Sequence, residues 1–240
     1  MRTHIALGVL ILASCAHLFA LSGCDLRNSA VKPLGTASDP AQRVKMSDHL
    51  RSQLPPDATV LRIDSPNMSP GGEEVVLYNS SRDEASPLPV LAIVQNEEIV
   101  KSYALGETLK PFGDYALLSY CKVTDTKSVN VIAVALRMSV DGSGIGFLVF
   151  GWIDGDYRIL FNEHTFEGRL TFFHGPTEFE LWKSNNDGEC VWCPQHYTVT
   201  TYRLQNDTYV MTKISKPAKA YSPGEVSATP VTTQSGKPTS

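Results

Sequence analysis

A series of short apolar segments fills residues 57–215, and it constrains the fold more than any other feature of the chain. Val, Ile, Leu and aromatic residues dominate these segments, and turn residues separate them, which is typical of β-strands. No amphipathic stretch of helical length interrupts the series, which argues against a βαβ fold and predicts an all-β domain. The predicted strands are Thr59–Asp64, Glu74–Tyr78, Val90–Gln95, Glu98–Ala104, Tyr115–Val123, Val129–Met138, Gly146–Ile153, Tyr157–Asn162, Gly168–Phe173, Glu178–Lys183, Tyr197–Leu204 and Thr208–Ile214.

Tight hairpins repeat along this series. In each hairpin an apolar residue and its partner five positions later flank a polar turn, and an acidic loop lies upstream. The hairpins occupy 94–99, 152–157 and 204–209, after loops at Asp83, Asp141 and Asp187. We therefore expect three units of about four antiparallel strands each, at 59–105, 116–162 and 169–215.

The second hairpin, Gly151-Trp152-x-Asp154-Gly155-Asp156-Tyr157, resembles the hairpins of FG-GAP-type repeats. These repeats build β-propellers from four-stranded blades, so the resemblance implies a partial propeller-like arrangement. Three units are fewer than a closed propeller normally uses, and an open meander, a barrel or a sandwich fits the same pattern. The calcium loop of the family, Asp-x-Asp-x-Asp-Gly, is missing from this sequence, which argues against calcium as a cofactor.

The first residues are organised like an export signal. Arg2 adds positive charge, an apolar run covers residues 5–21, and small residues precede a cysteine. The tetrapeptide Leu21-Ser22-Gly23-Cys24 resembles the lipobox of bacterial lipoproteins. The resemblance implies that residues 1–23 are a cleaved signal peptide. It also implies that Cys24 carries a diacylglycerol thioether, often with a further acyl chain such as palmitate on its amino group. The alternative is an uncleaved membrane helix, and the run is at the lower length limit for one.

A lipid on Cys24 would anchor the chain to the extracytoplasmic face of a bacterial membrane, since two or three acyl chains suffice for stable anchoring. Asp25, the next residue, resembles an inner-membrane retention signal. The expected compartment is oxidising and favours disulfides. The net charge of −4, with no basic block, argues against a nucleic-acid partner.

The remaining chain divides into a tether, the β-domain and a tail. Residues 24–56 form the predicted tether, which is polar in its first part and ends in a short helix. That helix is expected to start at Asp39-Pro40, because an acidic N-cap followed by Pro is a helix-start signal, and to end before Pro55-Pro56. The β-domain spans 57–215. Residues 216–240, rich in Pro, Ser and Thr, are predicted to be a disordered tail.

The segment Cys190-Val191-Trp192-Cys193-Pro194-Gln195-His196 is the most suggestive local feature for chemistry. The favoured interpretation is a structural disulfide between Cys190 and Cys193. A redox dithiol, two free thiols, and a zinc site with His196 and the more distant His174 are alternatives. A second pair of zinc ligands is missing, so we expect no zinc and no other cofactor apart from the lipid.

Two further residues stand out. Cys121 alternates with Leu117 and Val123 in an apolar strand and is expected to be a buried free thiol. Trp192 lies between two cysteines in a predicted loop, where an exposed indole could serve as a contact anchor for a partner.

These features favour a membrane-anchored, non-enzymatic domain that binds a protein or glycan of the cell envelope. The sequence has no Gly-x-Ser-x-Gly elbow and no His-Glu-x-x-His motif, so neither of these hydrolase motifs is present to support a catalytic role. One alternative is a redox or metal-dependent envelope enzyme that uses Cys190, Cys193 and His196. The other is a structural envelope protein without a specific ligand.

Overall fold

A computed structural model describes residues 25–27, 46–81, 88–109, 115–124, 130–138, 144–173, 175–188, 190, 193–222 and 225–228. It confirms an all-β fold, and every one of the twelve predicted strands is present. Boundaries differ from the predicted ones by three residues at most. The strands are β1 Asp25–Arg27, β2 Thr59–Asp64, β3 Glu74–Asn79, β4 Pro89–Gln95, β5 Glu98–Ala104, β6 Tyr115–Val123, β7 Val131–Met138, β8 Ile145–Ile153, β9 Asp156–Thr165, β10 Gly168–Phe172, β11 Glu178–Ser184, β12 Tyr197–Gln205 and β13 Thr208–Ser215. The described helices are α1 Asp48–Gln53, α2 Leu105–Thr108 and α3 Glu225–Ala228.

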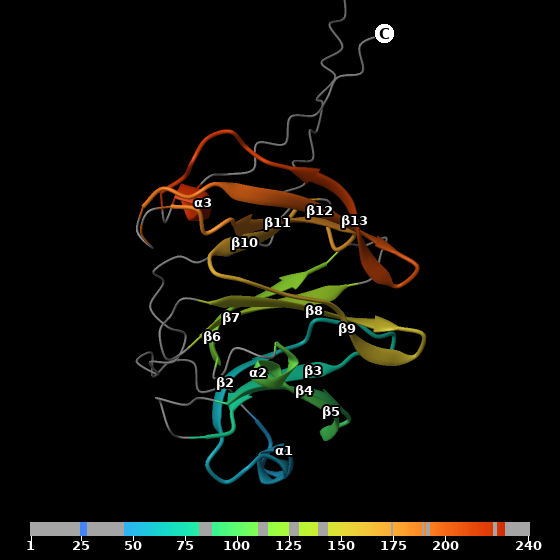
Figure 1. The fold of residues 1–240 in the computed structure, drawn as a ribbon. Coiled ribbons are helices and arrows are strands. Elements are labelled where there is room, and N and C mark those ends of the chain that lie inside the picture. The colour runs from blue at the N-terminus through green and yellow to red at the C-terminus, as the bar shows by residue number, and fades with distance from the viewer. Residues whose placement is uncertain are drawn as a thin grey trace, which may run out of the picture.

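The strands form three antiparallel sheets in chain order. The N-terminal sheet has the order β2-β3-β4-β5, and the middle sheet has the order β6-β7-β8-β9. The C-terminal sheet has the order β1-β10-β11-β12-β13, in which β1 extends the last four-stranded meander. Figure 1 shows the three sheets stacked in layers, with the middle sheet between the other two. The three predicted four-stranded units are therefore confirmed.

The middle sheet is buried on both faces, which explains the nearly continuous apolar sequence of its central strands. Along β7, Val131 and Ala133 pack into a core shared with the C-terminal sheet, whereas Ile132 and Val134 pack into a core shared with the N-terminal sheet. Successive side chains of a strand point to opposite faces, so a strand between two layers is apolar at every position. All four of these residues are fully buried.

Each predicted hairpin is closed by a two-residue turn in which both central residues have a positive φ. This is the type I′ geometry that matches the twist of paired strands, and it favours Asn, Asp and Gly. The turn residues are Asn96-Glu97, Asp154-Gly155 and Asn206-Asp207. The apolar pairs beside them are Val94 with Ile99, Trp152 with Tyr157 and Leu204 with Tyr209.

Helix α1 begins later than the predicted start at Asp39-Pro40, and residues 39–45 lie outside the described residues. The helix starts after Ser47, whose hydroxyl accepts a hydrogen bond from the Leu50 N–H at 3.2 Å. A serine that satisfies a free N–H of the first turn is a standard N-cap. Leu50 and Leu54 are buried with residues of the N-terminal sheet.

The start of the predicted tether is also ordered. β1 pairs antiparallel with β10, so that Asp25 lies opposite Thr171 and Arg27 lies opposite Arg169. Residues 28–45 of the tether lie outside the described residues. Within the described part of the chain, no helix is both long and apolar enough to span a bilayer.

The predicted tail is ordered in its first part. Residues 217–222 and 225–228, called here the C-terminal strap, fold back along the C-terminal sheet after β13, and α3 contacts β10. Tyr221 forms a bridge with Gln195, and Val226 is buried. The composition of residues 216–240 predicts disorder on average, but Tyr221 and Val226 supply two apolar anchors within it.

Candidate functional site

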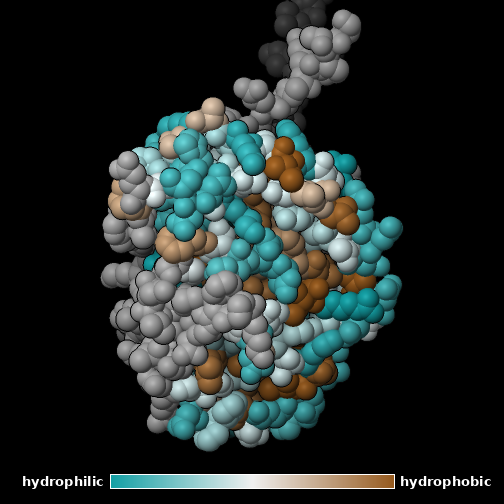
Figure 2. All heavy atoms as spheres, viewed as in Figure 1, coloured by the Kyte–Doolittle hydropathy of each residue, from teal (hydrophilic) through white to brown (hydrophobic). Residues whose placement is uncertain are grey.

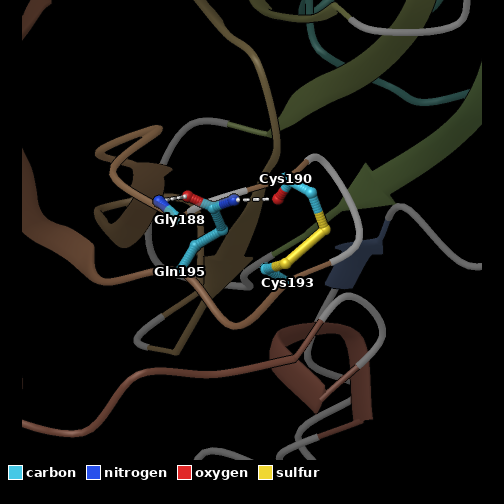
Figure 3. The surroundings of a disulfide bond; sticks show 4 residues. All are labelled: Gly188, Cys190, Cys193 and Gln195. Carbon is cyan, nitrogen blue, oxygen red and sulfur yellow. Dashed lines mark hydrogen bonds between the residues drawn. A yellow bond between two sulfur atoms is a disulfide. The ribbon is translucent and has the colours of Figure 1, made fainter.

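The loop between β11 and β12 is fixed by a disulfide between Cys190 and Cys193, whose Cα atoms are 5.0 Å apart. Gln195 is 2% exposed and braces the loop from inside. Its side-chain amide donates to the Cys190 carbonyl at 3.0 Å, and its Oε1 accepts from the Gly188 N–H at 2.8 Å (Figure 3). These contacts link Gly188, Cys190, Cys193 and Gln195 to one another at one end of the C-terminal sheet.

This arrangement bears on the metal and redox interpretations of the loop. Sulfur atoms joined in a disulfide are not thiolates, and thiolate is the form that binds zinc. The His196 imidazole Nδ1 lies 3.1 Å from Asp187 Oδ2, and the His196 N–H donates to Asp187 Oδ1 at 3.0 Å. Among the described residues, no group of three His, Cys, Asp or Glu side chains is placed to hold a metal ion. His174 and Trp192 lie outside the described residues.

The contact with His196 also affects Asp187. The hydrogen bond from the His196 N–H, together with the imidazole, lowers the pKa of the Asp187 carboxyl below its ordinary value. The carboxylate is therefore ionised at neutral pH. It connects the first part of the loop, which follows β11, with His196 at the end of the loop, directly before β12.

Cys121 of β6 differs from the expected buried free thiol. It is only partly buried and takes part in a disulfide. Cys190 and Cys193 are paired with each other, so the partner of Cys121 lies outside the described residues. The only other cysteines of the sequence are Cys15 and Cys24. The predicted free thiol is therefore wrong.

Beside the disulfide loop, the C-terminal sheet presents a cluster of Arg169, Trp182 and Tyr197, called here the aromatic face. The Arg169 guanidinium lies over the Trp182 ring at 4.9 Å and is almost fully buried, at 1% exposure. The Tyr197 hydroxyl donates to Glu167 Oε2 at 3.0 Å. Burial and the Glu167 charge raise the pKa of Tyr197 above its ordinary value, so its hydroxyl stays protonated and remains a donor.

The C-terminal strap covers the aromatic face. The Tyr221 ring meets Trp182 at 5.7 Å and Tyr197 at 6.0 Å, in both cases edge to face. Tyr221 and Gln195 exchange two backbone hydrogen bonds of 2.8 and 2.9 Å. Further along the strap, an Arg169 N–H donates to the Val226 carbonyl. The strap is thus held by its main chain as well as by its side chains.

The aromatic face and the strap were not predicted from the sequence. The available signal was Arg169, a charged residue in the middle of the apolar segment Gly168–Phe172. A charged side chain in a buried strand needs hydrogen-bonding or ionic partners, so it indicates that polar groups are arranged around it.

A second polar cluster fills the end of the interface between the N-terminal and middle sheets. The buried Glu73 carboxylate accepts hydrogen bonds from the Met68 N–H at 2.6 Å and the Ser69 N–H at 2.9 Å. It also lies 3.2 Å from the Tyr157 hydroxyl, which accepts from Gln95 Nε2 at 2.9 Å. These groups satisfy one another, so the cluster acts as a structural joint between the two layers.

Apolar side chains also reach the surface at the sheet edges. Val100 of β5 and Met211 and Ile214 of β13 are exposed, and both strands are edge strands. Figure 2 shows that apolar surface on this face of the molecule gathers towards the side where the ends of these strands lie. Lys213 in β13 places positive charge on one of these edges, a common protection against edge-to-edge pairing.

Removal of the loop disulfide should cost little stability. The double substitution Cys190→Ala with Cys193→Ala should lower the free energy of unfolding by about 1–2 kcal/mol, because closing so short a loop removes little chain entropy. Urea unfolding of the wild type and the double variant measures the difference. A loss above about 3 kcal/mol would contradict the view that the disulfide only stiffens a surface loop.

The loop, the aromatic face and the strap thus form one continuous site at the end of the C-terminal sheet. Any function that we assign to the domain is therefore argued from the residues of this site. Compared with protein-family models, curated proteins and solved structures, this chain matches none.

Proposed function

We propose that this protein is a bacterial lipoprotein, anchored by Cys24 to the extracytoplasmic face of a membrane, whose all-β domain binds a partner in the cell envelope. The observation that carries the proposal is the apolar segment 5–21 followed by Leu21-Ser22-Gly23-Cys24. A disulfide at Cys190 and Cys193 supports an oxidising compartment, where such bonds persist.

Binding, rather than catalysis, is the role that the geometry of the described domain favours. A disulfide-closed loop beside a cluster of buried arginine and aromatic residues is typical of interaction sites, where aromatic residues and Arg are enriched. The disulfide takes Cys190 and Cys193 out of the thiolate form that the alternative metal or redox enzyme would use at rest. We therefore propose no activity for the loop.

The lipid anchor can be tested by mass spectrometry of the mature protein. The full chain, produced in a bacterial host, should begin at Cys24 and carry the added mass of a diacylglycerol, and it should partition into a detergent phase. The Cys24→Ser variant should lack the lipid and remain in the aqueous phase. Cys15→Ser is the matched control, because Cys15 lies in the predicted signal peptide, and this variant should be lipidated as the wild type is. Separation of the inner and outer membranes tests the retention proposed for Asp25.

The same measurement decides between two uses of Cys24. Its sulfur can be part of a thioether or part of a disulfide, but not both. A mature chain with a disulfide between Cys24 and Cys121, and no lipid, would overturn the lipoprotein proposal.

A further inference from the structure

We propose that the aromatic face is a peptide-binding surface, which the protein's own C-terminal strap occupies in this structure. The inference rests on the proposed function as a binding domain and names the partner class. That partner is a protein segment that pairs its main chain with Gln195 at an aromatic residue and carries an aliphatic residue five positions later. Tyr221 and Val226 of the strap have this spacing.

The first support is that the surface recognises main chain. Tyr221 adds an antiparallel bridge to Gln195, with two backbone hydrogen bonds. The Arg169 guanidinium donates to the main-chain carbonyl of Val226. Backbone hydrogen bonds supply affinity for any extended peptide, and pockets for alternate side chains supply the selectivity. The contacts made to the strap can therefore be made to a segment of another protein.

The second support is that the domain builds this surface from rigid elements. Arg169 lies in β10, Trp182 in β11 and Tyr197 in β12, three adjacent strands of one sheet. Arg169 is 1% exposed and lies over the Trp182 ring. A buried guanidinium is costly unless its N–H groups are satisfied, and the strap satisfies one of them through the Val226 carbonyl.

The third support is that the occupant is lightly held. The strap buries one aliphatic side chain, Val226, and half-buries Tyr221. Its helix α3 has only four residues, and the ion pair between Lys219 and Glu225 is solvent-exposed. Exposed pairs contribute little, and segments with few buried contacts open at low free-energy cost. A partner can therefore displace the strap without unfolding the sheet.

Competition between strap and partner sets the expected size of the effect. A covalently attached segment has an effective concentration in the millimolar range. A free peptide of the same sequence that binds the open face at ~100 μM would then bind the closed protein about tenfold more weakly. Weakening the strap should restore the affinity.

A binding measurement with a labelled strap peptide tests the proposal. The probe is a fluorescent peptide with the sequence of residues 216–230, and the protein is the full mature chain, in detergent where it is lipidated. The variant Val226→Asp places a charge at the buried anchor and should release the strap. Fluorescence anisotropy should show that the variant binds the peptide at least about tenfold more tightly than the wild type does.

Controls separate recognition from non-specific effects. Met211→Asp, which places the same charge at an exposed residue of β13, should bind the peptide as weakly as the wild type. Peptides that carry Tyr221→Ala or Val226→Asp should bind the released protein at least about tenfold more weakly than the unchanged peptide. Because these two substitutions lie in the peptide, they leave the folding of the domain untouched.

The protein side is tested by Arg169→Lys in the Val226→Asp background, which should weaken peptide binding by about tenfold because Lys lacks the planar fork of Arg. Near-ultraviolet circular dichroism reports whether this variant is folded, and the peptide variants decide the outcome where it is not. Equal peptide binding by the wild type and the released variant would overturn the proposal. So would equal binding of the unchanged and substituted peptides. Neither result depends on whether Cys24 is lipidated, so failure here is distinct from failure of the lipoprotein proposal.

Discussion

The substitution Phe179→Ala should lower the free energy of unfolding by about 3–5 kcal/mol, the range for removing a buried aromatic side chain. Phe179 is fully buried in the core between the middle and C-terminal sheets. Its ring lies 4.9 Å from Phe161 of β9 and 4.7 Å from Tyr209 of β13. It also packs against Phe172 and Tyr202 within its own sheet. The substitution would therefore open a cavity where two layers meet.

Chemical unfolding followed by circular dichroism measures this effect. Phe179→Leu is the matched control, because it keeps most of the buried volume and should cost clearly less than the alanine variant. The fluorescence of the tryptophans should change in the same transition, since small domains unfold cooperatively. A loss below about 1 kcal/mol would show that the two layers are not joined through this aromatic cluster.

The substitution Glu73→Ala should have the second largest effect, about 3 kcal/mol or more. Its carboxylate accepts hydrogen bonds from the Met68 and Ser69 N–H groups and from the Ser69 hydroxyl. Hydrogen bonds to charged groups contribute about 1.5–3 kcal/mol each, and a buried donor left without a partner costs a further penalty. Tyr157, which reaches this cluster from the middle sheet, would lose a contact as well.

Glu74 provides the control for Glu73. It is the next residue in the chain, carries the same side chain and is exposed. Glu74→Ala should change the free energy of unfolding by about 0.5 kcal/mol or less, as surface substitutions usually do. Thermal unfolding of the two variants beside the wild type gives the comparison. Similar midpoints for both variants would mean that the Glu73 cluster does not join the N-terminal and middle sheets.

The strand pattern was predictable because local sequence encodes it. Each hairpin carries two turn residues suited to a positive φ, flanked by an apolar pair that lies directly opposite in the sheet, as Trp152 does with Tyr157. The continuous apolar runs of β7 and β8 also contained the information that the middle sheet is covered on both faces. The stacking order of the sheets follows from the chain order of the three meanders.

The features that were not predictable depend on pairing between distant segments. Three residues, Asp25–Arg27, form a strand because β10 offers them an unpaired edge, and no local pattern marks them. The strap is ordered because Tyr221 finds Gln195, from which it is separated by two strands. The start of helix α1 was misplaced for a local reason, since its N-cap is Ser47 and the prediction placed the cap at Asp39.

The candidate site was predicted in part. The 190–193 disulfide lies among the interpretations that the spacing of the cysteines allowed, and the compartment inferred from Cys24 favoured it. The aromatic face needed the structure, because its residues come from three strands and its cover comes from the tail. Only the charge of Arg169 within an apolar strand pointed to it.

The position of β1 determines how the proposed lipoprotein would stand on its membrane. Asp25, which directly follows the proposed lipidation site Cys24, pairs with Thr171, near the turn that joins β10 to β11. With no flexible spacer there, the domain would sit against the bilayer in a fixed orientation, with this turn facing the lipid. The disulfide loop and the strap lie at the opposite end of β11, whose seven residues span roughly 20 Å. Partners approaching from the envelope would meet that outer end first, and the anchor would set its height above the membrane.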